Sequence, residues 1–276
     1  MIDAIHDFAL CRPRFGYRRV AALLRSEGWR VNDKRVHRLW KSEGLQIRRK
    51  ARKRRRSGLS LNACNRRKAL GKNHVWSYDF VTERTHRGGR VRILTVVDEF
   101  TRECLAVEVR RHYTGEDVVE TLKELFALRG RPRCLRSDNG PEFVSKAVKK
   151  WLRTSRVKTR FVAPGSPWEN GYIESFNGKL RDECLNGELF LSRAEAQYVV
   201  NRWRMDYNHH RPHSRLGWQT PAEFSARCRD YAREKNWPKQ CGDMADGMVP
   251  LACCVLPGSA SPHPPEHSEI MQPTLT

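Results

Sequence analysis

VWSYDFVTERTHRGGRVRILTVVDEFTRECLAVEVRR, residues 75–111, is the stretch that decides the fold. It contains three apolar runs rich in β-branched and aromatic residues, at 75–81, 90–100 and 104–111, joined by short polar links. Runs of this composition and length are typical of β-strands. Because links this short join neighbouring antiparallel strands, the stretch predicts a three-stranded antiparallel meander.

Downstream of the meander, helical and strand-like patterns alternate. The expected helices and strands lie at 114–129, 133–138, 142–153, 158–163 and 169–185, followed by helices at 192–209 and 220–236. Three strands followed by alternating helices and strands give a mixed sheet with helices packed on it. We therefore predict an α/β (α+β) fold class, a ribonuclease-H-like mixed five-stranded sheet with flanking helices.

The residues upstream of the sheet predict a small all-α segment. Residues 17–27 have a helical period that stops at Gly28, and a second helix begins near Asn32 and runs to Gly44. Two short helices with a tight turn resemble a helix-turn-helix, although a generic helical pair with a solvated basic face explains the pattern equally well. Three exposed cations of the second helix are the expected DNA contacts: Lys34, Arg35 and Arg38.

The charge of the chain is concentrated at its front. The 276 residues carry a net charge of +22, and residues 1–70 hold 21 Lys and Arg but only 5 Asp and Glu. No apolar run approaches the ~18 residues that a membrane span needs. The partner expected from this charge is therefore a nucleic acid and not a membrane.

The densest basic run is RRKARKRRR at 48–56, with eight basic residues in nine. Such a run repels itself until phosphates neutralise it, so we expect it to contact DNA, although a solvated linker has the same composition. The expected contacts are Arg48, Arg49, Lys50, Arg52, Lys53, Arg54, Arg55 and Arg56.

These patterns divide the chain into four parts. We expect a helix-turn-helix-like segment at 1–47, a basic linker at 48–72, a catalytic core with C-terminal helices at 73–227, and a helix end with a disordered tail at 228–276. The nine cysteines include no C-x-x-C pair, so neither a disulfide framework nor a zinc site is favoured. Reduced thiols predict a cytoplasmic protein, and the resemblance described below implies that it is bacterial and nucleoid-associated.

Three acidic residues lie where the ends of the predicted elements should converge. Asp79 is on the first strand, Asp138 ends the fourth strand, and Glu174 is on the helix that follows the fifth. Phosphodiester cleavage needs an activated nucleophile and neutralised charge, which two Mg²⁺ or Mn²⁺ ions held by carboxylates provide. We therefore predict that these residues are catalytic and ligate two such ions. The polar stripe that Glu174 shares with Asn170, Asn177 and Arg181 predicts further DNA contacts at these three residues, and Lys179 of the same helix is another expected contact.

The core resembles the integrase-type catalytic domain of bacterial insertion-sequence transposases, the OrfB products of insertion-sequence family three. The resemblance is carried by VWSYDFV (75–81), LTVVDEFTREC (94–104), SDNGPEF (137–143), PGSPWENGYIESFNGKLRDECL (164–185) and YNHHRPHSRLGWQTPAEF (207–224). It implies that Asp79, Asp138 and Glu174 are the DDE triad, separated by the family's 35-residue gap, and that Arg181 contacts donor DNA. It also implies a homo-oligomer on double-stranded DNA and an upstream helix-turn-helix partner protein from the same element.

The resemblance implies a transposase that cuts insertion-sequence ends and joins them to target DNA. Two alternatives remain open from the residues alone. A non-catalytic DNA-binding regulator would use residues 1–70 but leaves the three carboxylates unexplained. A ribonuclease-H-fold nuclease would cut DNA without joining it.

Overall fold

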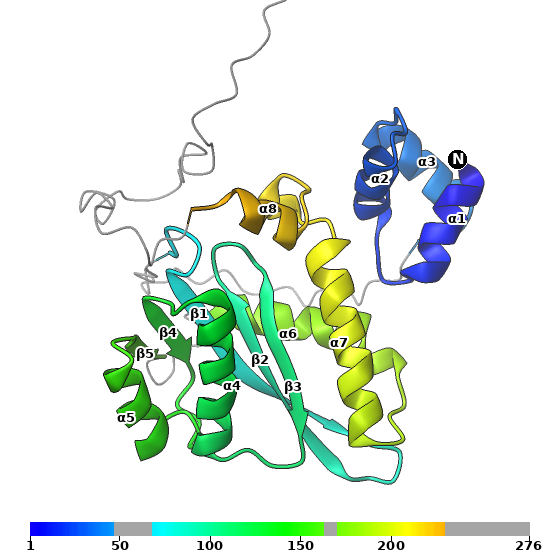
Figure 1. Cartoon of the computed structure of the whole chain (residues 1–276). Helices are drawn as coiled ribbons and strands as arrows, with labels where there is room; N and C mark the ends of the chain where they lie inside the picture. Colours follow the sequence, from blue (N-terminus) through cyan, green and yellow to red (C-terminus); the bar gives the residue numbers. More distant parts are fainter. Residues whose placement is uncertain (47–67, 163–169, 230–276) are drawn as a thin grey trace, which may run out of the picture.

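The computed structural model describes residues 1–46, 68–162 and 170–229. Its front forms a helical unit of α1 (Ile2–Cys11), α2 (Tyr17–Ser26) and α3 (Asp33–Ser42), shown in blue in Figure 1. The remaining elements form the core around one sheet. Its helices are α4 (Gly115–Arg129), α5 (Lys146–Thr154), α6 (Gly171–Glu183), α7 (Arg193–His209) and α8 (Pro221–Arg227), with short 3-10 turns η2 (Leu185–Gly187) and η3 (Ser214–Leu216).

The sheet has five strands and is mixed, which confirms the predicted fold class. Its strands are β1 (Val75–Arg84), β2 (Arg90–Asp98), β3 (Cys104–Arg110), β4 (Cys134–Ser137) and β5 (Lys158–Phe161). They lie in the order β3-β2-β1-β4-β5. The first three form the predicted antiparallel meander, whereas β4 and β5 run parallel to β1. Strand β1 is therefore central, with an antiparallel neighbour on one side and a parallel neighbour on the other.

Helices cover both faces of the sheet (Figure 1). Trp76 and Tyr78 of β1 pack in the hydrophobic cluster that includes α4 and α5, whereas Val81 packs in the cluster that includes α6 and α7. Because successive side chains of a strand point to opposite faces, Asp79 points to the same face as Val81, toward α6. This alternation decides on which side of the sheet a site can form.

The front unit contains one more helix than its sequence pattern predicted. Helix α1 contributes the buried Ile5 to a small core with Val20 and Leu24 of α2 and Val36 and Trp40 of α3. Helix α3 begins where the sequence pattern placed it, because the Asn32 side chain accepts a hydrogen bond from the backbone of Arg35 and caps the helix. The unit is a three-helix cluster rather than a helix pair.

Two predicted helices were too long. Helix α5 begins at Lys146 rather than 142, because the Ser145 hydroxyl accepts from the Val148 backbone and caps the helix there. Helix α8 ends at Arg227, where Cys228 adopts an extended backbone. The predicted continuation to 236 falls largely, and the tail from 238 entirely, outside the described residues.

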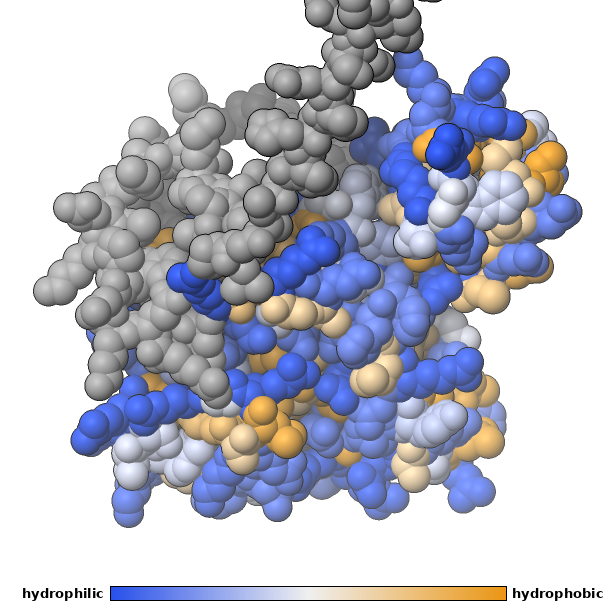
Figure 2. Space-filling view, turned by 45° about the horizontal axis from the view of Figure 1, so that its top comes forward, coloured by the Kyte–Doolittle hydropathy of each residue, from blue (hydrophilic) through white to orange (hydrophobic). Residues whose placement is uncertain are grey.

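No helix in the described ranges is long and apolar enough to cross a membrane. Figure 2 shows a face on which hydrophilic residues dominate and hydrophobic ones lie in small groups.

Candidate active site

Asp79 and Asp138 come from neighbouring parallel strands. In the β1–β4 pair the last partners are Ser77 and Arg136, so Asp79 and Asp138 each follow the paired segment by two residues. Asp138 follows the last residue of β4 and is exposed, whereas Asp79 is half-buried. The Asp138 carboxylate accepts a hydrogen bond from the Gly140 backbone at 3.0 Å, which fixes the turn after β4.

Helix α6 packs against β1 and β2 and orients Asp79. The Asn177 amide donates to Asp79 Oδ2 at 2.9 Å, and its carbonyl accepts from the Thr95 hydroxyl at 2.9 Å. The Phe80 backbone donates to the other oxygen of Asp79 at 2.7 Å. Both Asp79 oxygens are therefore held, one by its own strand and one by α6.

Glu174 lies in the first turn of α6, with its side chain exposed. The pKa of Asp79 is raised to about 6, chiefly by burial and in addition by the negative charges of Asp138 and Glu174, against the lowering effect of the hydrogen bonds from Phe80 and Asn177. Asp138 and Glu174, the other two acids predicted from the sequence, thus each lie within electrostatic range of Asp79. Burial, rather than charge repulsion, is the larger cause of the raised pKa.

The donor chemistry fits a divalent cation bound through oxygen. Carboxylates from two adjacent strands are the hard ligands that Mg²⁺ and Mn²⁺ prefer, and a cation beside Asp79 would relieve the repulsion that raises its pKa. Within the described ranges, however, no three acidic, histidine or cysteine side chains are gathered closely enough to hold one ion. The exposed side chain of Glu174 is therefore not gathered with those of Asp79 and Asp138 in this structure.

A buried ion pair links the strand residues that come just before the two aspartates. Arg136, two residues before Asp138, donates to both carboxylate oxygens of Glu99 at 2.9 and 3.0 Å, and the Ser77 hydroxyl donates to the same carboxylate. Glu99 and Arg136 are both buried. This network joins β4 to β1 at the residues that come just before the site. The sequence pattern did not predict it.

The predicted DNA contacts on α6 are only partly exposed. Asn170 and Asn177 are buried, which corrects the expectation that both face outward with Glu174. Asn177 lies between Glu174 and the buried stripe of α6, close enough to the sheet to bind Asp79. On a helical wheel, Asn177 lies at an angle closer to the buried stripe of α6 than Glu174 does. This angle is the one sequence signal that could have predicted that Asn177 is buried and Glu174 is not.

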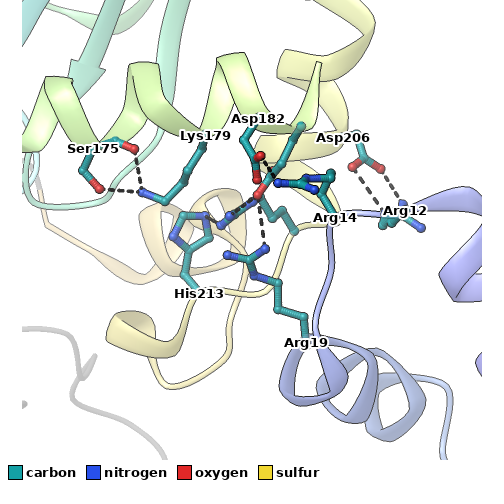
Figure 3. Close-up of polar contacts among 10 residues, drawn as sticks. Arg12, Arg14, Arg19, Ser175, Lys179, Asp182, Asp206 and His213 are labelled. Atoms are coloured by element: carbon teal, nitrogen blue, oxygen red, sulfur yellow. Dashed lines mark hydrogen bonds and ion pairs between the residues drawn. The ribbon is translucent and has the colours of Figure 1, made fainter. Parts of the chain in front are cut away.

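The two cations predicted on α6 have partners within the protein. Lys179 is half-buried and donates to the hydroxyl and backbone carbonyl of Ser175 (Figure 3). Arg181 is about half exposed, donates to the Thr82 carbonyl at 3.1 Å and lies 3.6 Å from the Glu83 carboxylate. Its DNA contact remains a prediction, because the exposed part of the guanidinium is still accessible to phosphate.

The predicted contacts outside the core divide into two groups. Lys34, Arg35 and Arg38 are exposed on α3, as expected for a helix that meets DNA. The basic run at 48–56 lies outside the described residues.

Comparison with known proteins places this architecture in a family. Two models described as "Integrase core domain" match residues 69–167 and 155–221, and an "HTH-like domain" model matches residues 2–55. A protein of insertion element IS407 from Burkholderia multivorans is 43% identical over 229 residues, covering 83% of this chain and 80% of the relative. The chain belongs to the integrase-core family of insertion-element proteins.

Two further relatives and one solved structure of the same fold show how far the similarity extends. An IS476 protein of Xanthomonas euvesicatoria is 42% identical over 81% of this chain and 64% of its own length. Transposase InsF of insertion sequence IS3A from Escherichia coli is 28% identical over 79% of this chain and 78% of its length. A simian T-cell lymphotropic virus intasome structure shares the fold with a TM-score of 0.51 at 16% identity, covering 85% of this chain and 78% of that one.

Proposed function

We propose that this chain is a DNA transposase that cuts the ends of its insertion element and joins them to target DNA, with Asp79, Asp138 and Glu174 as its catalytic carboxylates. The observation that carries the proposal is that the charges of Asp138, just after β4, and Glu174, on α6, both act on Asp79 of β1, which α6 also holds through Asn177. Family membership supports the reaction class. The test is strand transfer of a labelled element end.

The protein's residues prepare the site in distinct ways. Asp79, held by Phe80 and Asn177, offers fixed oxygens, while Asp138 offers exposed ones. Glu174 supplies the third carboxylate. Two divalent ions held by these groups would activate water, and then a DNA 3′-OH, for in-line attack and would neutralise charge at phosphorus.

We extend the proposal to the assembly. An element has two ends, and their coordinated cutting and joining requires more than one catalytic site, which a homo-oligomer on double-stranded DNA provides. An upstream helix-turn-helix protein of the same element is the further partner that we expect to aid recognition of the ends.

Replacing Asn177 should weaken metal binding without removing a metal ligand. Asn177→Leu keeps the side-chain volume but leaves Asp79 without the amide that orients it, so Mg²⁺ affinity should fall about 10- to 100-fold. Calorimetric titration of Mg²⁺ measures this directly. The control is Ser175→Ala, at an exposed position of the same helix. Unchanged affinity in a folded Asn177→Leu protein would show that Asn177 serves packing alone.

Activity should depend on pH through Asp79. Its pKa of about 6 is raised above the ordinary value, so the carboxyl is ionised at neutral pH and becomes protonated below that value. A proton there competes with the cation, so Mg²⁺ affinity and cleavage rate should fall about tenfold for each pH unit below ~6. Both are measured at constant ionic strength. A flat profile down to pH ~5 would separate Asp79 from metal binding.

Deleting residues 48–56 should weaken binding to DNA of any sequence. Eight cations can displace up to eight counterions from the phosphates. The plot of log affinity against log salt should therefore become less steep, by about 0.9 for each phosphate that the shortened chain no longer binds. Fluorescence anisotropy with a random duplex at several salt concentrations measures the slope. The same slope in both proteins would mean that these residues bind no phosphate.

A further inference from the structure

Ion pairs join the helical unit at the front of the chain to the catalytic core (Figure 3). Arg14 pairs with Asp182 near the end of α6, and Arg12 pairs with Asp206 on α7, with Nε lying 3.4 Å from Oδ2. The partners are 168 and 194 residues apart in the chain. These contacts make residues 12–19 a docking segment on the core.

The centre of this docking surface is the buried carboxylate of Glu183, the last residue of α6. Arg19 of α2 donates to it at 3.1 Å, and Arg211 donates to it at 2.8 and 2.6 Å. A carboxylate at a helix C-terminus is disfavoured by the exposed carbonyl groups, so these two guanidinium groups are needed to stabilise Glu183 where it lies. One of the two comes from the helical unit.

The surrounding interface is aromatic and incompletely filled. Guanidinium groups of Arg12, Arg19 and Arg211 lie 5.0 to 5.8 Å from the centre of the buried Phe15 ring, at distances typical of cation–π contacts. An open cavity of about 550 Å³ lies beside them, lined in part by Arg12, Arg14, Trp203 and Asp206. Ion pairs, rather than close apolar packing, therefore determine how the helical unit is positioned on the core.

Helix α6 connects this interface to the catalytic site. Glu174 is in its first turn and Glu183 is its last residue, about 14 Å apart along the helix axis at 1.5 Å per residue. The unit docked at the Glu183 end carries α3 with its exposed cations Lys34, Arg35 and Arg38. The helix expected to bind DNA and a catalytic carboxylate are thus linked through one short helix.

We propose that this ion-pair interface fixes the distance along DNA between the sequence bound by the helical unit and the phosphate that is cut. Arg12, Arg14 and Arg19, with their acidic partners, then determine the position of cleavage. They act as positioning residues and do not touch the scissile phosphate. This inference rests on the proposed transposase function.

Charge reversal on each side of the interface tests the proposal. The double variant Arg12→Asp with Arg14→Asp reverses the charge on the helical unit's side of the interface. The double variant Asp182→Arg with Asp206→Arg reverses the charge on the core's side. The fourfold variant combines all four changes and restores opposite charges across the interface. Each one-sided reversal should scatter the cleavage positions and reduce cutting at the wild-type position about tenfold or more, because small misplacements are costly. The fourfold variant should recover the wild-type position. Sequencing-gel mapping of a labelled element end gives the readout.

Reversing the charge on the core's side of the interface distinguishes this proposal from a general electrostatic attraction between the protein and DNA. It adds positive charge, so general attraction predicts tighter DNA binding and unchanged cleavage positions, whereas loss of docking predicts scattered cleavage. Small-angle scattering of the full chain provides a readout besides activity, since both one-sided reversals should increase the radius of gyration and the fourfold variant should restore it. Glu120→Arg on α4, whose partner Arg110 lies within the core, is the matched control.

The outcomes are distinguishable. If the wild type makes no cleavage product, the proposed function fails and this inference fails with it. If the wild type and both reversals cut at the same position, or the fourfold variant does not recover it, only this inference is overturned. Should a reversal lower the melting temperature, the milder pair Asp182→Asn with Asp206→Asn carries the same test.

Discussion

Glu174→Gln, Asp79→Asn and Asp138→Asn should each reduce DNA cleavage and strand transfer by at least about a thousandfold, while DNA affinity stays near that of the wild type. Each change keeps the side-chain volume and removes one negative charge from the site. Because the three carboxylates act on the same reacting phosphate, double variants should lose little more than single ones.

Single-turnover kinetics with a labelled element end, alongside an anisotropy measurement of binding, checks this expectation. Glu116→Gln is the matched control, an exposed carboxylate on α4 across the sheet from the site. Cleavage near the wild-type rate in any one of the three variants would remove that residue from the catalytic set.

Glu99→Ala should cost about 3–5 kcal/mol in the free energy of unfolding, because it removes the buried carboxylate that accepts two hydrogen bonds from the buried Arg136 guanidinium. Chemical denaturation monitored by circular dichroism measures the loss. The matched control is Glu120→Ala, which breaks an ion pair whose acidic side chain is 62% exposed, and which should cost no more than ~1 kcal/mol.

A double replacement separates the cost of an unpaired charge from the cost of lost packing. Glu99→Met with Arg136→Met removes both charges and should recover much of the stability lost in Glu99→Ala, since apolar residues of similar volume often replace buried pairs without penalty. If Glu99→Ala were as stable as the wild type, the pair would not be what holds β4 against β1 beneath Asp138.

The sequence predicted best those features of the fold and site that depend on both residue chemistry and hydrophobic periodicity. The three apolar runs of residues 75–111 predicted the meander, and the acids at 79, 138 and 174 were expected at the ends of elements that the structure brings together. Period-2 alternation in β1 also explains why Asp79 faces α6. These features depend on local pattern, which one sequence is sufficient to reveal.

What the sequence could not show depends on contacts between distant segments. A helical wheel gives the angle of Asn177 but not which neighbour it meets, so its hydrogen bond to Asp79 and its burial were missed. The Glu99–Arg136 pair and the docking of Arg12, Arg14 and Arg19 join residues between 37 and 194 positions apart. In the sequence, arginines near the start of a basic chain indicate DNA binding in general. No local pattern predicts that Arg12, Arg14 and Arg19 contact the core.

The central claim is that this chain itself cuts and joins DNA through metal held by its carboxylates. The most direct test incubates the full chain with a labelled oligonucleotide carrying the element's end and an unlabelled target duplex, with Mg²⁺, Mn²⁺, Ca²⁺ or excess EDTA. We predict cleaved and joined products with Mg²⁺ or Mn²⁺, DNA binding without products in Ca²⁺, and none with Glu174→Gln. Products in excess EDTA, a protein–DNA adduct that survives denaturation, or cleavage never followed by joining would contradict it.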